Sequence, residues 1–143
     1  MAKVIAVNIS REKGVPKQPL EAGNFEANYG LQGDAHAGNW HRQVSLLGIE
    51  SINKMEKMGL NNIESGSFAE NITTEGLKLY ELPIGTRLKL GAVLMEVTQI
   101  GKECHGGCAI RQTVGDCIMP REGIFAKVIT GGVLKPGDEI QVL

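Results

Sequence analysis

The sequence has no long apolar run and no large excess of charge of either sign. Its apolar stretches are all shorter than a membrane-spanning helix, and its first residues lack the apolar core and cleavage pattern of a secretory signal. The 15 Lys and Arg residues nearly balance the 16 Asp and Glu residues, for a net charge of -1. Charge therefore gives no reason to expect binding to nucleic acid or to a membrane. We expect a cytoplasmic protein.

Cysteine is also scarce, with 3 residues in a chain of 143. An odd number of cysteines close together in the sequence does not suit a secreted disulfide scaffold, and favours a reducing compartment with redox or metal chemistry. The length is enough for one domain with its own core and too short for two. We expect a single domain over residues 1–143.

Glycine, by contrast, is abundant, and 19 Gly with 5 Pro divide the chain into short apolar segments. This pattern is typical of a β-rich domain with many turns. A helix is expected over residues 48–58, where apolar side chains form one stripe. Residues 11–23 are expected to be a loop. Strands are expected over residues 3–9, 78–82, 87–90, 93–100, 124–129 and 139–143. The predicted fold is mostly β, a small closed β-barrel with one or two short helices.

Cys104 lies in a glycine-rich segment directly after the longest expected strand, and loops on a rigid scaffold often carry chemistry. The positive charges of Lys102, His105 and Arg111 would favour the reactive thiolate form. Glu103 beside the thiol would oppose it. The alternative is a buried and inert cysteine. The sequence therefore offers Cys104 as a candidate reactive thiol.

A second group of polar residues, Asp34, His36 and Arg42, lies in the first half of the chain. In an extended segment Asp34 and His36 would point the same way, which would allow a metal site, an acid–base pair or an oriented hydrogen bond. The alternative is a turn closed by the Asp34 carboxylate. Arg42 could hold an anionic ligand through its fork of donors.

Several other short motifs have ordinary structural explanations when each is taken alone. Asn71 could cap a strand turn, and Arg121 with Glu122 could form a surface ion pair. The motifs in chain order are Gly33-Asp34-Ala35-His36, Arg42-Gln43-Val44-Ser45-Leu46, Glu70-Asn71-Ile72, Leu82-Pro83-Ile84-Gly85-Thr86, the Cys104 segment, Gly123-Ile124-Phe125-Ala126 and Gly137-Asp138. In this order they resemble the MOSC domain, the family named for the carboxy-terminal domain of molybdenum cofactor sulfurase. The resemblance covers residues 3–143.

The resemblance implies a barrel-like β fold and a role in molybdenum cofactor metabolism, as a sulfur carrier or a cofactor-binding protein. Cys104 would be the functional thiol, holding a persulfide or ligating molybdenum, while Asp34 and His36 would shape the pocket floor or relay a proton. Relatives often have Pro before this cysteine, where this chain has Glu103. The predicted cofactor-binding residues, for an anionic pterin phosphate or oxyanion, are Arg42, Arg111, Arg121, Asn71 and Lys102.

The expected partners are a cysteine desulfurase or enzymes of molybdenum cofactor synthesis, and pyridoxal phosphate would enter only through such a partner. Two other functions stay open. Cys104, Cys108 and Cys117 could hold a metal such as zinc in a non-catalytic adaptor domain, although Cys108 or Cys117 could instead resolve an oxidised Cys104 by forming a transient disulfide. The chain could also be the molybdenum-dependent component of a reductase for N-hydroxylated compounds, which would need an electron-transfer partner.

Overall fold

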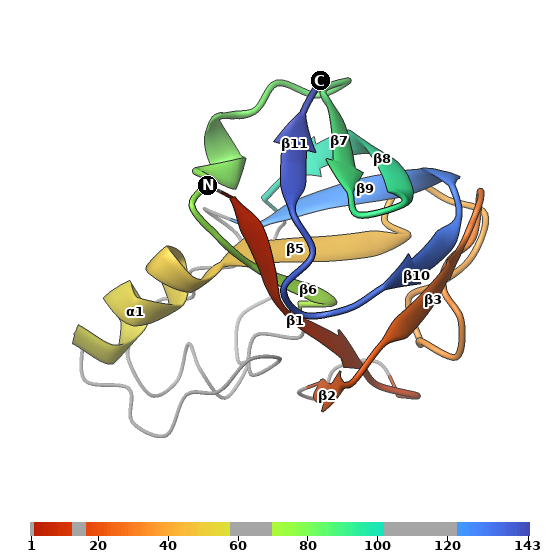
Figure 1. The fold of residues 1–143 in the computed structure, drawn as a ribbon, viewed down its shortest axis with the longest axis horizontal. Helices are drawn as coiled ribbons and strands as arrows, with labels where there is room; N and C mark the ends of the chain where they lie inside the picture. Colours follow the sequence, from red (N-terminus) through yellow and green to blue (C-terminus); the bar gives the residue numbers. More distant parts are fainter. Residues whose placement is uncertain (1, 13–16, 58–69, 102–122) are drawn as a thin grey trace.

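The computed structural model describes residues 2–12, 17–57, 70–101 and 123–143, and Figure 1 shows their arrangement. The described strands form two sheets. The main sheet has eight strands in the order β11-β7-β8-β9-β5-β6-β1-β2, and the small sheet has three in the order β10-β3-β4. The main-sheet strands are β1 (Lys3–Ile9), β2 (Gln18–Leu20), β5 (Val44–Gly48), β6 (Ile72–Glu75), β7 (Arg87–Leu90), β8 (Val93–Ile100), β9 (Ile124–Thr130) and β11 (Ile140–Val142). The small sheet contains β3 (Gly23–Glu26), β4 (Gly30–Leu31) and β10 (Gly132–Leu134).

Neighbouring strands of the main sheet are antiparallel except for β5 and β6, which run parallel. The helix α1 (Ile49–Lys57) follows β5 directly and contacts both strands of the parallel pair. A parallel pair needs such a crossover, because its second strand must begin at the same end as the first. None of the helices in the described ranges is long and apolar enough to cross a membrane.

The prediction of a closed barrel is not confirmed, because within the described residues neither sheet closes on itself. The two end strands of the main sheet are β2 and β11. The segment before β11 does reach β1, through an isolated bridge between Lys3 and Glu139 and a hydrogen bond of 2.8 Å from the Val4 amide to the Asp138 carbonyl. This contact is too short to form a ladder, and β2 pairs with the other half of β1. The sheet is therefore strongly curved but open (Figure 1).

An apolar core fills one face of the main sheet. In β7 and β8 every second residue is buried, the alternation expected of strands with one covered face. Val44 and Leu46 of β5 lie in this core together with Ile72 of β6. A bulge between Val4 and Ala6 shifts the alternation in β1, so that Val4 and Val7 both join the core.

The other residues of these strands point to the opposite face, which we call the site face. Strand β5 is buried at every position, so its two faces are covered equally. The buried residues of the site face are mostly polar and include Asn8, Ser45, Asn71 and Thr73. One sheet thus separates an apolar layer from a polar one.

The predicted elements agree with the structure in the most strongly patterned segments. The helix over residues 48–58 is confirmed as α1, and strands 3–9, 87–90 and 93–100 are confirmed with the predicted bounds. The strand over 124–129 runs one residue further, and the strand over 139–143 is confirmed as the shorter β11.

Two predictions were wrong. Residues 78–82 do not form a strand, because Leu79–Glu81 is a 3-10 helix that buries Leu79. The predicted loop over 11–23 contains β2, which includes Pro19. Strand β2 is at the edge of the sheet, where the missing amide hydrogen of proline is tolerated.

Candidate functional site

A row of residues crosses the site face over five adjacent strands. Gln99 of β8 pairs with Phe125 of β9, which pairs with Ser45 of β5. The Asn71 amide donates to the Ser45 carbonyl at 2.9 Å, and the Asn8 amide to the Asn71 carbonyl at 2.6 Å. Cross-strand neighbours project to the same face of a sheet. This cross-strand row is the framework of the candidate site.

Asn71 joins three strands at the centre of the row. Its side-chain oxygen accepts hydrogen bonds from the Ser45 amide at 3.0 Å and the Ser45 hydroxyl at 3.2 Å. Its side-chain nitrogen donates to the Asn8 carbonyl at 3.3 Å. The residue is fully buried, so these bonds satisfy groups that would otherwise be costly to bury. Asn71 therefore fixes the spacing of β1, β5 and β6.

Asn8 and Glu70 form a second buried contact beside Asn71. The Asn8 side-chain nitrogen donates to the Glu70 carbonyl and to the Thr73 hydroxyl, both at 3.2 Å. The Thr73 hydroxyl donates to the Glu70 carboxylate at 2.7 Å. The side-chain oxygen of Asn8 has no hydrogen-bond partner among the described residues although it is buried. A buried acceptor of this kind is a place where a donor on a water or a ligand would be favourable.

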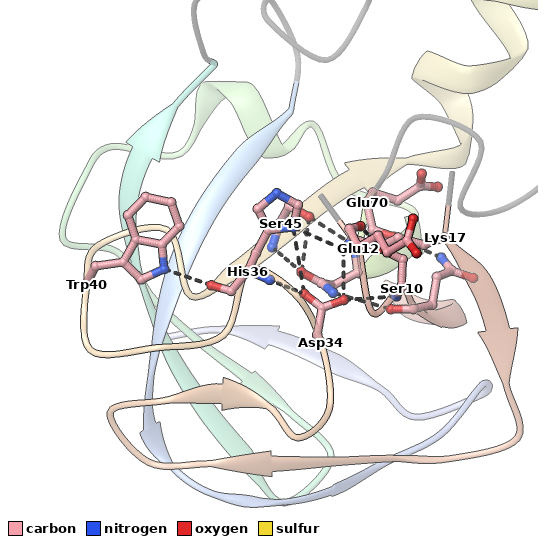
Figure 2. Close-up of polar contacts among 10 residues, drawn as sticks. Ser10, Glu12, Lys17, Asp34, His36, Trp40, Ser45 and Glu70 are labelled. Atoms are coloured by element: carbon pink, nitrogen blue, oxygen red, sulfur yellow. Dashed lines mark hydrogen bonds and ion pairs between the residues drawn. The ribbon is translucent and has the colours of Figure 1, made fainter. Parts of the chain in front are cut away.

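Lys17, Asp34 and His36 meet at the end of β1 (Figure 2). The Lys17 ammonium lies 2.7 Å from Oδ1 of Asp34 and 3.1 Å from Nδ1 of His36. Oδ1 of Asp34 also accepts a hydrogen bond from the Ser10 amide at 3.1 Å. The side chains of Lys17 and Asp34 are completely buried, and that of His36 is 29% exposed. The structure therefore brings Asp34 and His36 together, as their spacing suggested, but around a lysine.

The conformation of the Asp34 segment is a turn and not an extended strand. Oδ2 of Asp34 accepts a hydrogen bond from the His36 amide at 3.0 Å, and the Ala37 amide donates to the Asp34 carbonyl at 3.3 Å. This confirms the turn closed by the Asp34 carboxylate and corrects the extended alternative. The Asp34 carboxylate therefore has two roles, because it holds the backbone of the turn through the His36 amide and pairs with the Lys17 ammonium.

The ionisation of Asp34 follows from these contacts. Burial by itself raises the pKa of the carboxyl group. The Lys17 ammonium and the backbone amides of Ser10 and His36 more than offset this, so the pKa lies below its ordinary value of 3.8. Asp34 is consequently a carboxylate near neutral pH, where it acts as an acceptor and a counter-ion.

Sequence reasoning missed Lys17, which was assigned to a loop. It lies 17 positions before Asp34, and no periodicity links the two residues. Lysine is almost never fully buried unless it is paired, so its burial could not be expected before its partner was known.

Arg42 is attached to the other end of the cross-strand row. Its Nε donates to the Gln99 side-chain oxygen at 3.0 Å, and its guanidinium lies over the Phe125 ring, 5.2 Å from the centroid. The ring stacking and the hydrogen bond restrict the guanidinium plane. The exposed ring of His41 shares the Gln99 oxygen at 3.0 Å. Within the described residues, the Arg42 guanidinium makes its hydrogen bond through Nε. Its two outer nitrogens point away from this bond and form the fork that could bind an anion.

Gln99 also binds the end of β8. Its side-chain nitrogen donates to the Gly101 carbonyl at 2.8 Å, and the Gly101 amide donates to the Gly123 carbonyl at 2.7 Å. Gly101 and Gly123 flank the sequence that contains Cys104. The Gln99 side chain therefore links Arg42 to Gly101, the residue directly before the sequence that contains Cys104.

The loop over residues 32–43 carries Asp34, His36 and Arg42, and a close contact joins its two ends. Gly30 has φ +117°, and a Cβ there would lie 2.8 Å from the Gln43 carbonyl oxygen. Only glycine accepts both this backbone conformation and the close approach. The side-chain oxygen of buried Gln43 accepts a hydrogen bond from the Val128 amide of β9 at 2.9 Å, so the loop is also anchored to the main sheet.

The remaining predicted site residues lie outside the described residues. They are Lys102, Cys104, Cys108, Arg111, Cys117 and Arg121. Among the residues that are described, no group of three or more His, Cys, Asp or Glu side chains could hold a metal ion.

The sequence model of the MOSC domain family matches residues 32–141 of this chain. The chain belongs to the MOSC domain family, which is linked to molybdenum cofactor-related function. The family assignment made from the order of the short motifs is thereby confirmed.

Similar solved structures support the same fold. YuaD of Bacillus subtilis is 21% identical with a TM-score of 0.81, and the match covers 99% of this chain and 96% of that protein. YiiM of Geobacillus stearothermophilus is 18% identical with a TM-score of 0.79, covering 100% and 75%. YiiM of Escherichia coli is 18% identical with a TM-score of 0.70, covering 100% and 70%. At these identities the likeness shows the fold alone. Comparison with curated proteins gives no significant match.

Proposed function

We propose that this MOSC protein carries sulfur or binds the molybdenum cofactor in molybdenum cofactor metabolism, with Cys104 as its reactive thiol. The observation that carries the proposal is the Arg42–Gln99–Gly101 contact. It joins a restrained guanidinium to Gly101, which lies three positions before Cys104 in the sequence. A cation held there suits an anionic group that must be brought to the thiol.

As a sulfur carrier, Cys104 takes up one sulfur atom without net oxidation. Its thiolate attacks the terminal sulfur of a persulfide on a donor protein, such as a cysteine desulfurase. A new sulfur–sulfur bond forms at Cys104, the donor's sulfur–sulfur bond breaks, and the donor cysteine leaves as a thiolate. A second transfer of the same kind passes the sulfur to the acceptor.

The described residues fit one part of an anionic pterin cofactor. Arg42 offers a restrained fork for a phosphate. Lys17 does not offer a second cation, because its side chain is completely buried and paired with Asp34. When bound, the cofactor would supply a thiophilic metal for which a thiolate is a suitable ligand. The task of the described residues would then be to bind and orient its anionic group.

Intact mass spectrometry tests the carrier proposal. The protein is incubated with a cysteine desulfurase and cysteine, and we expect a gain of roughly 32 Da, the mass of one sulfur, that reducing agent removes. Cys104→Ser should abolish the adduct, and the matched control Cys117→Ser should keep it. An adduct that persists in Cys104→Ser would exclude Cys104 as the carrier.

Analysis of the purified protein separates the other functions. Bound molybdenum and pterin in stoichiometric amount would favour cofactor binding over sulfur carriage. Stoichiometric zinc that survives dialysis and is lost in both Cys104→Ser and Cys108→Ser would instead favour the metal-binding adaptor.

A further inference from the structure

Thr74 is a polar residue on the core side of the main sheet. Along β6, Ile72 belongs to the core cluster, whereas the Thr73 hydroxyl bonds to residues of the site face. Successive side chains of a strand point to opposite faces, so Thr74 lies on the same face as Ile72. Thr74 is completely buried, and its hydroxyl has no hydrogen-bond partner among the described residues. A buried hydroxyl without a partner is costly, so this one needs an explanation.

Three oxygens surround the place where a side chain of Gly48 would lie. Gly48 is the residue directly before α1, and it pairs with Thr74 in the parallel ladder between β5 and β6. For a Cβ built on Gly48, the nearest atoms outside residues 47–49 are Oε1 of Glu50 at 3.0 Å, the Leu77 carbonyl oxygen at 3.6 Å and the Thr74 hydroxyl oxygen at 3.8 Å. These oxygens belong to α1, to the segment after β6 and to β6 itself.

The three oxygens cannot satisfy one another. A carboxylate and a backbone carbonyl are acceptors only, and a hydroxyl has a single hydrogen to donate. The Glu50 carboxylate uses its other oxygen, Oε2, to accept a hydrogen bond from the Gly76 amide at 2.8 Å. The cluster therefore needs a group with two donors, for the carboxylate and the carbonyl, and with an acceptor for the hydroxyl.

A water molecule has this combination, whereas a metal cation does not. Water can donate to Oε1 of Glu50 and to the Leu77 carbonyl while it accepts from the Thr74 hydroxyl, and about three hydrogen bonds are typical of a buried water. A cation offers no acceptor for the hydroxyl proton, and a single carboxylate with two neutral oxygens falls short of the about six to eight oxygen ligands of Ca²⁺. Glu50 is exposed, so solvent reaches the cluster from that side.

We propose that the space beside Gly48 is a binding site for one structural water molecule, which bridges Thr74, Glu50 and Leu77. The water holds the start of α1 against β6, and glycine at position 48 makes room for it. The site is independent of the proposed function, because none of these residues belongs to the candidate functional site.

A high-resolution crystal structure of the wild-type protein tests the site directly. We expect an ordered water about 2.7–2.8 Å from the Thr74 hydroxyl oxygen, and also within hydrogen-bond distance of Oε1 of Glu50 and the Leu77 carbonyl. A lack of ordered solvent at this place, or a Thr74 hydroxyl bonded to a protein group, would overturn the proposal. So would a cation, which is recognised by shorter distances to its oxygen ligands, about 2.3–2.6 Å for Ca²⁺.

The sign of a stability change provides a second test. Valine has nearly the shape of threonine without the hydroxyl. If the Thr74 hydroxyl were unsatisfied, Thr74→Val would remove a buried unpaired group and raise the urea midpoint of unfolding. Because a water satisfies it, we expect the midpoint to fall. Thr73→Val is the matched control, since the Thr73 hydroxyl has protein partners, and its midpoint should also fall. A midpoint that rises or stays the same in Thr74→Val contradicts the bridge.

Gly48→Ala tests whether the water lies beside that glycine. The added methyl group takes the place of the water, which leaves the Thr74 hydroxyl without a partner. In this background we expect Thr74→Val to raise the urea midpoint, the reverse of its effect in the wild-type protein. An effect of the same sign and size in both backgrounds would show that the space beside Gly48 has no part in satisfying the hydroxyl.

Discussion

The two faces of strand β5 are both buried but are built in different ways. Leu46 and Ser45 are neighbours in β5, and both are almost inaccessible to solvent. Leu46 belongs to a core cluster in which many apolar residues share the contacts, whereas Ser45 has defined partners in Asn71. Apolar burial is non-directional, but a hydrogen bond requires a particular atom at a particular distance. On the core face the cost of a substitution should therefore follow the apolar volume that is removed, whereas on the site face it should follow which hydrogen-bonding groups are left without a partner.

The largest expected loss of stability comes from breaking the buried ion pair at one end only. Lys17→Met leaves the Asp34 carboxylate buried without its counter-ion, and we expect the free energy of unfolding to fall by about 3–5 kcal/mol in urea titrations. The double variant Lys17→Met with Asp34→Asn removes both charges and should recover much of the loss. A double variant no more stable than Lys17→Met would show that the charge itself is not the cause.

The next comparison uses the two neighbours in β5. Leu46→Ala leaves a cavity in the core and should cost about 2–5 kcal/mol in the same measurement. Ser45→Ala should cost only about 1 kcal/mol, since the Ser45 backbone amide still satisfies the Asn71 oxygen. Similar costs for the two variants would contradict the distinction between the faces.

The pH dependence of stability isolates the charge of Asp34. The pKa of Asp34 is lowered in the folded protein, so its contribution is complete above the unfolded value of about 3.9 and disappears as the pH falls through the lower folded value. Wild-type protein should therefore lose stability more steeply than Asp34→Asn below pH of about 4. Parallel curves for the two proteins over that range would mean that Asp34 has no such linkage.

The smallest expected effect on stability, and a specific one on ligand binding, is at Gln99. Gln99→Leu removes the hydrogen bond that holds Arg42, which is partly exposed, so we expect a change of at most about 1 kcal/mol in unfolding. The affinity for phosphate, measured by calorimetry, should fall in Gln99→Leu and should also fall in Arg42→Gln. Weaker binding in Arg42→Gln but unchanged binding in Gln99→Leu would show that Gln99 does not position the guanidinium.

The parts of the fold that could be predicted are those with an alternating pattern. Strands β7 and β8 bury every second residue, and this alternation is visible in the sequence. Strand β5 is buried on both faces and has no alternation, so it was not identified as a strand. The segment over 78–82 is apolar enough for a strand, but Leu79–Glu81 forms a 3-10 helix that buries only Leu79. Closure of the sheet depends on pairing between distant segments, which local patterns do not contain.

The candidate site could be predicted only where its contacts are local. The turn at Asp34 involves the amide two residues later, and it was one of the two alternatives that the sequence left open for this segment. The contacts of Asp34 with Lys17 and of Arg42 with Gln99 join residues 17 and 57 positions apart. Such partners are chosen by the way the strands meet, so neither Lys17 nor Gln99 could be recognised before the topology was known.

The hydrogen bond between Gly101 and Gly123 has a consequence for how this scaffold can evolve. It continues the ladder between β8 and β9 by one backbone hydrogen bond beyond the pair Ile100 and Ile124. Backbone donors and acceptors do not change when side chains are substituted. Substitutions between these two glycines can therefore accumulate in a lineage without altering the backbone groups that end the ladder.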